Sequence, residues 1–217
     1  MYGIIRFVFG CLVLALGVLL IHKVNAIINK RKYIIALTVF TVLLIPALSF
    51  LPFENYFVTF ESPEQAYKYM NIGYKDSPLV IDGESSSLVV GNKNGTHSYL
   101  IIPRSKEGWK IGTGADTRLI GEMFVDGISV NVYQYKSTSD YYISVFDVTG
   151  SDGDITDIYG SKFYSLSNDS SFSDKEYVTY YAHVKNFDFD YQLNVNGQEL
   201  SFNNSDNGSK FSSEKPE

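Results

Sequence analysis

The chain has 217 residues, with 18 Lys and Arg against 24 Asp and Glu. Five of the basic residues and none of the acidic ones lie in residues 1–53, so residues 54–217 carry a formal charge of 13 − 24 = −11. Such a charge repels phosphate backbones and argues against nucleic acid as a partner. The only cysteine is Cys11, which excludes an internal disulfide and a cysteine nucleophile from the rest of the chain.

Two long apolar runs open the chain, at residues 3–21 and 33–53. The first contains one charged residue, Arg6, and the second contains none. A helix of about 20 residues crosses the hydrocarbon of a bilayer, because each residue adds about 1.5 Å to its length. The two runs therefore predict a transmembrane helical hairpin with the lipid bilayer as a partner.

The segment between the two runs is short and basic, with Lys23, Lys30, Arg31 and Lys32. Short loops rich in Lys and Arg stay on the cytoplasmic side. This predicts a multi-pass plasma-membrane protein whose residues 54–202 form an extracytoplasmic domain. The alternative is a cleaved signal peptide in the first run, but no small-residue cleavage site follows it.

A short helix is predicted to begin after Ser62. Serine can cap a helix, Pro63 suits the first helical position, and Gln65 can reach back in a capping box. Ala66, Tyr67 and Met70 then give a short apolar face, and the helix is expected to end before Gly73.

From residue 79 onward the pattern changes to short β-prone runs separated by turn residues, which predicts a mainly antiparallel, β-sandwich-like domain. The expected strands cover residues 79–81, 87–90, 98–102, 109–111, 128–132, 142–146 and 177–184.

Two Asn-Gly pairs predict tight hairpins in this region. Asn94-Gly95 would pair Val90 with Tyr99 and Leu88 with Ile101. Asn196-Gly197 would pair Leu193 with Leu200 and Tyr191 with Phe202, which leaves one apolar and one polar face.

The polar composition of residues 203–217 predicts a disordered tail. The Gly- and Asp-rich stretch from Asp147 to Asp157 reads either as a loop within one sheet or as a sign of two subdomains that divide near residue 120.

The same stretch offers the clearest candidate for a metal site. Asp147, Asp152, Asp154 and Asp157 cluster around two glycines, and calcium takes several oxygen ligands from one flexible loop. The spacing differs from the EF-hand pattern, and Gly and Asp are also the usual residues of turns. Calcium is therefore a hypothesis beside the favoured reading of a turn, and no other cofactor is expected.

No catalytic motif stands out. His97 and His183 lie in predicted strands without ligand-spaced His, Cys or Glu neighbours, and the serine-hydrolase and metalloprotease signatures are missing. This favours a protein that is not an enzyme, and the catalytic residues of any activity stay unknown.

Three segments carry a resemblance to a known group of proteins: Phe60–Ala66, Ile101–Arg104 and Gly108–Ile111. Together they resemble small membrane-anchored proteins of low-GC Gram-positive bacteria, in which a Ser-Pro-Glu-x-Ala helix precedes a β-meander and a Gly-Trp-Lys strand. The likeness covers about 50 residues of this chain. It implies a bacterial plasma-membrane setting and no particular activity.

The sequence leaves several functions open. The favoured hypothesis is an acidic binding or interaction module for a peptide, cell-wall material or a membrane protein, with clustered exposed Tyr and Phe marking the contact surface. The alternatives are an exported hydrolase that uses Asp147, Asp152 and Asp154, and an accessory or immunity-type subunit of a membrane complex.

Overall fold

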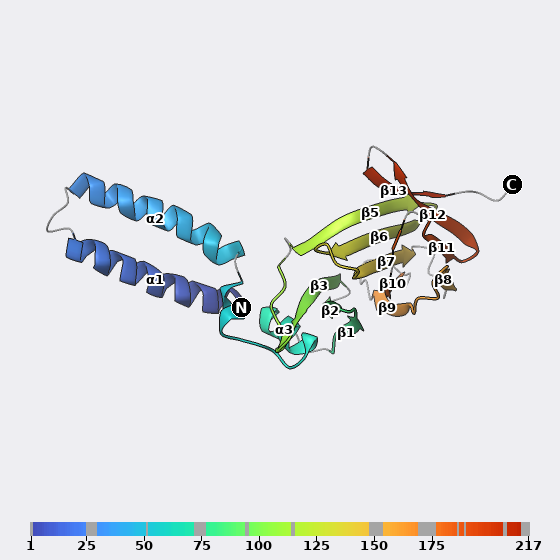
Figure 1. The fold of residues 1–217 in the computed structure, drawn as a ribbon, viewed down its shortest axis with the longest axis horizontal. Helices are drawn as coiled ribbons and strands as arrows, with labels where there is room; N and C mark the ends of the chain where they lie inside the picture. The colour runs from blue at the N-terminus through green and yellow to red at the C-terminus, as the bar shows by residue number, and fades with distance from the viewer. Residues whose placement is uncertain are drawn as a thin grey trace. The chain divides into compact units, whose positions relative to one another are not determined.

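The computed structural model describes residues 2–24, 30–50, 52–71, 77–93, 96–113, 116–147, 154–168, 177–185, 187–188, 190–205 and 208–213. The chain divides into two compact units, one of residues 1–58 and 68–73 and the other of residues 59–67 and 74–217. Figure 1 shows the helices and strands of both.

The first unit contains two long helices, α1 (Tyr2–Val24) and α2 (Lys30–Phe50), and a short 3₁₀ helix η1 (Phe53–Tyr56). The two long helices run antiparallel, and the ring of Phe9 stacks on that of Phe53 at 4.6 Å between centroids (Figure 1). Large apolar side chains of both helices are exposed, among them Leu16 and Leu43. The hairpin alone therefore leaves much of its apolar surface uncovered.

The prediction of a transmembrane hairpin is wrong. Within the residues described here, no helix combines the length and the apolar character that crossing a membrane requires. The charged residues are part of the helices, because Arg6 lies inside α1 and Lys30, Arg31 and Lys32 form the first turn of α2. In addition, α2 ends at Phe50 instead of Phe53, so the helical part of the second run is shorter than the run itself.

The predicted multi-pass placement in the plasma membrane, with an extracytoplasmic domain, rested on those spans and is wrong for the same reason. The bilayer as a partner rested on them as well.

The short helix α3 (Pro63–Met70) begins in the second unit, at the residue that the capping pattern predicted, and its residues 68–70 are assigned to the first unit. The main-chain N–H of Gln65 donates to Ser62 Oγ at 3.3 Å, and Gln65 Oε1 accepts from the main-chain N–H of Glu61 at 3.3 Å. Ala66 and Tyr67 are fully buried, and the hydroxyl of Tyr67 lies 3.0 Å from Ser98 Oγ. The predicted helix start is confirmed.

The strands of this unit form two sheets. The smaller sheet has the order β1-β2-β3-β4, and the larger has the order β8-β11-β12-β13-β5-β6-β7-β10-β9. The smaller contains β1 (Leu79–Asp82), β2 (Ser86–Lys93), β3 (Thr96–Ser105) and β4 (Gly108–Trp109). The larger contains β5 (Thr117–Val125), β6 (Ile128–Tyr135), β7 (Tyr141–Asp147), β8 (Ile155–Asp157), β9 (Tyr164–Asn168), β10 (Tyr177–Val184), β11 (Gln192–Val195), β12 (Gln198–Ser205) and β13 (Gly208–Ser213).

Both predicted hairpins have the expected register. In β2 and β3, Val90 pairs with Tyr99 and Leu88 with Ile101, while Asn94-Gly95 lies outside the described residues. In β11 and β12, Leu193 pairs with Leu200. Asn196 and Gly197 have φ of 54° and 84°, the left-handed values that a two-residue turn of this type requires.

Among the strands that the structure describes, pairing is antiparallel except between β13 and β5, which run parallel at Lys210 and Glu122. Strand β13 lies inside the segment that the sequence assigned to a disordered tail. It forms because β12 extends to Ser205 and offers a complete edge, with which all of Gly208–Ser213 pairs. Polar composition did not prevent this, since a neighbouring strand satisfies the main-chain hydrogen bonds.

The two sheets share a buried apolar cluster within this unit. Ile81, Leu88, Val90 and Ile101 come from the smaller sheet, and Tyr135, Tyr142 and Tyr181 from the larger one. A second buried apolar cluster packs on the larger sheet and includes Val130, Val145, Tyr191 and Leu200. The change from one sheet to the other falls between Trp109 and Thr117, and the strands of both sheets belong to one compact unit.

Candidate functional site

Three of the four aspartates of the predicted calcium site lie in or beside strands β7 and β8. Asp147 ends β7, Asp154 is exposed just before β8, and Asp157 ends β8. Asp152 lies outside the described residues.

The carboxylate of Asp157 accepts hydrogen bonds from its own turn and from Tyr191. Its Oδ1 accepts hydrogen bonds from the main-chain N–H groups of Tyr159 at 3.1 Å and Ser161 at 2.7 Å, and its Oδ2 accepts from the Tyr191 hydroxyl at 3.1 Å. Burial raises the pKa of Tyr191, so its hydroxyl stays a donor. Both carboxylate oxygens therefore fix the turn that follows β8.

Among the residues that the structure describes, no three of His, Cys, Asp and Glu converge to hold a metal ion. Since Asp152 and the side chain of Asp147 fall outside that set, the calcium site stays a prediction. The favoured turn reading agrees with the contacts of Asp157.

A cluster of polar groups around the buried carboxylate of Asp140, which sequence reasoning did not single out, lies between the two sheets. We call it the Asp140 cluster; it consists of Glu84, Ser85, Ser86, Asp140, Tyr142 and His183. The side chain of Asp140, in the turn between β6 and β7, has no exposed area. Its neighbours come from the β1–β2 turn and from β10, so the cluster joins segments that are distant in sequence.

Asp140 accepts hydrogen bonds on both oxygens. Its Oδ1 takes the Glu84 main-chain N–H at 2.7 Å and His183 Nε2 at 3.1 Å. Its Oδ2 takes the Ser85 main-chain N–H at 2.8 Å, Ser85 Oγ at 2.6 Å and Ser86 Oγ at 2.8 Å. Burial by itself would raise the pKa of Asp140, but the hydrogen bonds from Ser85, Glu84 and Ser86 outweigh it and hold that pKa below its ordinary value.

The arrangement does not match a Ser-His-Asp triad. In a triad the imidazole stands between the serine and the carboxylate, whereas here Ser86 and His183 both bind Asp140 directly. Gly83 allows this packing, because a Cβ there would lie 2.6 Å from both Asp140 Oδ1 and the Tyr142 hydroxyl. The Asp140 cluster therefore links the two sheets through hydrogen bonds to one buried carboxylate.

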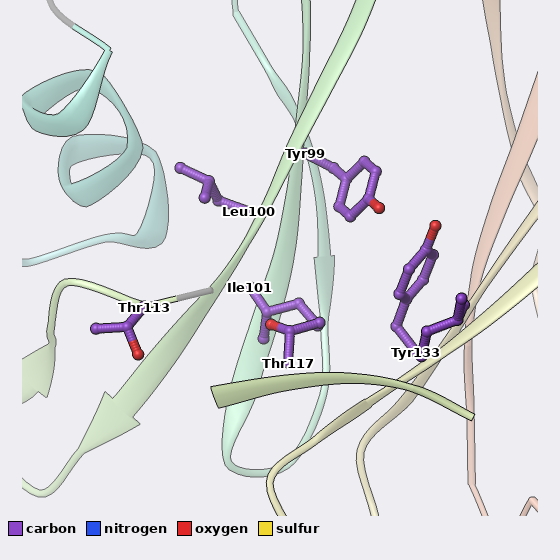
Figure 2. A pocket seen from close by; sticks show the side chains of 7 residues that line it. Tyr99, Leu100, Ile101, Thr113, Thr117 and Tyr133 are labelled. Carbon is purple, nitrogen blue, oxygen red and sulfur yellow. The ribbon is translucent and has the colours of Figure 1, made fainter. Parts of the chain in front are cut away.

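A pocket of about 270 Å³ opens between β3 and β5. Its walls are formed by Tyr99, Leu100, Ile101, Thr113, Thr117, Leu119 and Tyr133, and we call it the β3–β5 pocket. Figure 2 shows that Tyr99 of β3 and Tyr133 of β6 point toward each other across it. All seven side chains are uncharged, and their accessible surface is more apolar than polar.

Aromatic rings and hydroxyl groups dominate the chemistry of this pocket. The rings of Tyr99 and Tyr133 lie 5.0 Å apart between centroids and are tilted by 46°. Tyr99 is 39% exposed and Leu119 is 47% exposed, so both remain accessible to a partner. Burial, followed by the hydrogen bond with Tyr99, raises the pKa of Tyr133, so this hydroxyl is protonated at neutral pH.

His97, two residues before Tyr99 on β3, is committed to packing between the sheets. Its Nδ1 lies 3.0 Å from the Tyr181 hydroxyl and its Nε2 lies 3.2 Å from the Ser167 carbonyl oxygen. Loss of water contact lowers the pKa of His97, and burial raises the pKa of Tyr181 to about 12. Both ring nitrogens have partners, so His97 supports the wall of the pocket.

A smaller pocket of about 170 Å³ lies on β8, β11 and β12. It is lined by Thr156, Asp157, Ile158, Gln192, Leu193, Asn194 and Glu199. Asp157 already accepts hydrogen bonds there from the turn after β8 and from Tyr191.

No family model, curated protein or solved structure matches the chain, so the comparisons assign it to no family. The resemblance to small membrane-anchored proteins of Gram-positive bacteria stays a prediction. The candidate site accordingly rests on the geometry of this chain alone.

Sequence reasoning named the kind of surface but not the residues. Clustered exposed tyrosines were expected to mark a contact surface; of the two facing tyrosines, Tyr99 is exposed and Tyr133 is half-buried. The sequence placed Tyr99 in a hairpin strand, but β5, which carries Thr117 and Leu119, was not predicted. Without β5, nothing indicated that these side chains would share a pocket.

Proposed function

We propose that this chain is a non-catalytic binding module and that the β3–β5 pocket is its ligand site. The observation that carries the proposal is an open, uncharged pocket with two facing tyrosines in a strongly acidic part of the chain. Pockets that bind small groups are mostly apolar and contain a few polar groups that fix orientation. Tyr99 and Tyr133 supply both properties.

The lining chemistry favours binding over catalysis. General acid–base and nucleophilic catalysis need a group such as a carboxylate, imidazole, thiol or amine, activated by its neighbours. The seven lining residues offer hydroxyl groups of Tyr and Thr and aliphatic side chains instead. A neutral, partly apolar group that also forms hydrogen bonds fits this surface.

The hydrolase alternative receives less support. Its carboxylates were Asp147, Asp152 and Asp154, and of these side chains the structure describes only Asp154, which is exposed. The buried carboxylate of Asp140 has both its oxygens occupied by donors of the protein. No observation separately favours the accessory-subunit alternative.

The test compares two arginine substitutions on the same strand. Leu119→Arg places a long charged side chain in the pocket wall. Phe124→Arg, the control, places the same side chain at an exposed residue of β5 outside the pocket. The purified wild-type chain is screened against a random peptide library and a glycan array. Each binder is then measured on both variants by isothermal titration calorimetry.

We expect Leu119→Arg to weaken the selected binders about tenfold or more, because one lost apolar contact and one unpaired charge each cost about 1–3 kcal/mol. Phe124→Arg is expected to leave their Kd unchanged. Binders that lose affinity equally on both variants, or a screen without any binder sensitive to Leu119→Arg, would refute the proposal.

A further inference from the structure

The main chain beside the pocket identifies the class of ligand. We infer that the β3–β5 pocket receives a side chain of an extended peptide, whose main chain adds as a new strand to the edge of β3. The inference rests on the proposed function and names its ligand class. It combines a strand edge, a pocket of one-residue size and the charge of the surrounding domain.

The first observation is the open edge of β3. Strand β2 pairs along one side of β3 from Thr96 to Pro103, whereas β4 reaches only Arg104 and Ser105 on the other side. The next contact along this side is from the main-chain N–H of Lys110 to the Pro103 carbonyl oxygen, at 3.0 Å. Among the described strands, none continues beside β3 at Tyr99.

The direction of the main-chain groups follows from two main-chain hydrogen bonds. The N–H of Arg104 donates to the Ser85 carbonyl oxygen on the β2 side, and the Pro103 carbonyl oxygen accepts from Lys110 on the opposite side. Main-chain groups of successive residues in a strand point to alternate sides. Tyr99, four residues before Pro103, therefore directs its N–H and C=O away from β2, along the edge that borders the pocket.

The facing wall of the pocket is a strand edge as well. Strand β5 pairs with β6 along its length, but β13 reaches it only at Glu122. Thr117 and Leu119, which line the pocket, thus precede the point where β13 arrives. The chain passes close to β3 at Gly112, where the Ile101 carbonyl oxygen leaves no room for a side chain. Beyond it, Thr113 lines the pocket (Figure 2).

Pocket size selects one side chain of the ligand. Pockets for drug-sized molecules have volumes of about 300–1,000 Å³, and the β3–β5 pocket, at about 270 Å³, lies just below that range. The tilted rings of Tyr99 and Tyr133 favour an aromatic or branched aliphatic side chain. Edge-strand recognition has this form elsewhere, with affinity from the main chain and specificity from a pocket for alternate side chains.

Charge selects the residues on either side of that anchor. Residues 54–217 carry a formal charge of 13 − 24 = −11, while the pocket itself is uncharged. A peptide with Lys or Arg beside the anchor is attracted by this field, and one with Asp or Glu is repelled. The ligand is therefore an extended, basic peptide with an apolar anchor residue.

The experiment uses the full chain and the acetylated, amidated peptide Lys-Thr-Phe-Thr-Lys, with Kd measured by calorimetry. One variant peptide is N-methylated at the alternate amides of its first, third and fifth residues, and another at its second and fourth. A strand pairs with its neighbour through every second residue, so one of the two patterns should weaken binding about tenfold or more and the other should not. Replacing the peptide's Phe with Ala, or both Lys with Glu, should also weaken binding.

The outcomes separate this inference from the proposed function. Binding that depends on Leu119 but tolerates both methylation patterns overturns the added strand and leaves the binding pocket in place. The same holds if glycans bind at the pocket while the peptide fails to bind at about 1 mM. Peptide binding that is unaffected by Leu119→Arg overturns both.

Discussion

The Asp140 cluster and the β3–β5 pocket occupy the same unit, and both are built from strands of both sheets, but they use polar groups in opposite ways. In the Asp140 cluster, groups of Glu84, Ser85, Ser86 and His183 donate hydrogen bonds to a carboxylate that has no exposed area. In the β3–β5 pocket, tyrosine and threonine hydroxyls border an open, mostly apolar surface.

This difference separates stability from recognition. A buried polar group stabilises a fold only when all its hydrogen bonds are made, and the Asp140 cluster meets that condition. A surface that binds a partner must keep apolar area and hydrogen-bonding groups exposed, as the β3–β5 pocket does around Tyr99 and Leu119. Changes in the cluster should therefore affect folding, and changes in the pocket should affect binding.

The largest expected effect comes from Asp140→Ala. The change leaves two main-chain N–H groups, two serine hydroxyls and His183 without their acceptor, so the free energy of unfolding should fall by about 3–5 kcal/mol. Urea unfolding followed by circular dichroism measures it. Asp140→Asn, which keeps the shape and one acceptor oxygen, should cost clearly less. A loss below about 1 kcal/mol for Asp140→Ala would show that the cluster does not hold the sheets together.

A change of pH is expected to have an intermediate effect on the free energy of unfolding. The pKa of Asp140 is lowered in the folded chain, so the unfolded chain binds a proton at higher pH than the folded one. The stabilisation is complete above the ordinary carboxyl pKa of about 3.9 and is lost as pH falls through that value toward the folded pKa. The free energy of unfolding, measured between about pH 7 and pH 3, should therefore fall more steeply for the wild type than for Asp140→Asn.

Glu84 titrates in the same direction, because its hydrogen bond and ion pair with Lys185, at 2.8 Å, lower its pKa. It keeps this pair in both proteins, so the difference between them reports Asp140. Parallel pH profiles for the wild type and Asp140→Asn would contradict the assignment.

The smallest effect on stability is expected from Tyr99→Ala. The ring is 39% exposed and contacts Tyr133 across an open pocket, so its removal should cost about 1–2 kcal/mol, less than the loss of Asp140. Binding to the pocket should fall about tenfold, because the aromatic wall is lost. Tyr99→Phe keeps the ring and is expected to retain most of both properties. If Tyr99→Ala destabilised the chain as strongly as Asp140→Ala, the pocket would be part of the core and the comparison would fail.

Local chemistry was sufficient to predict several elements of the fold. Ser62, Pro63 and Gln65 placed the start of α3, because capping depends on residues within one turn. Asn196-Gly197 set the register of β11 and β12, since the alternation of apolar residues allows only one pairing with a buried face. The same holds for Leu88 with Ile101 in β2 and β3.

The apolar runs at residues 3–21 and 33–53 show where composition alone misled. Each run does form a helix, as its length and apolar character indicated. In the structure Arg6 lies inside α1, Lys30–Lys32 form the first turn of α2, and α2 ends at Phe50. No helix of the described residues is long and apolar enough to cross a membrane. Helix ends depend on the whole chain and are poorly fixed by a hydropathy pattern.

By itself, then, the sequence determined the local elements: α3, two hairpin registers and the mainly antiparallel strands. Only the tertiary structure decided which distant residues meet, because burial and pairing partners are set by the assembly of both sheets. Ser85 and Asp140 lie 55 residues apart along the chain and share a buried hydrogen bond. Likewise, a polar segment forms β13 because it pairs with the edge of β12. Strand β5 places Leu119 in the same pocket as the residues of β3.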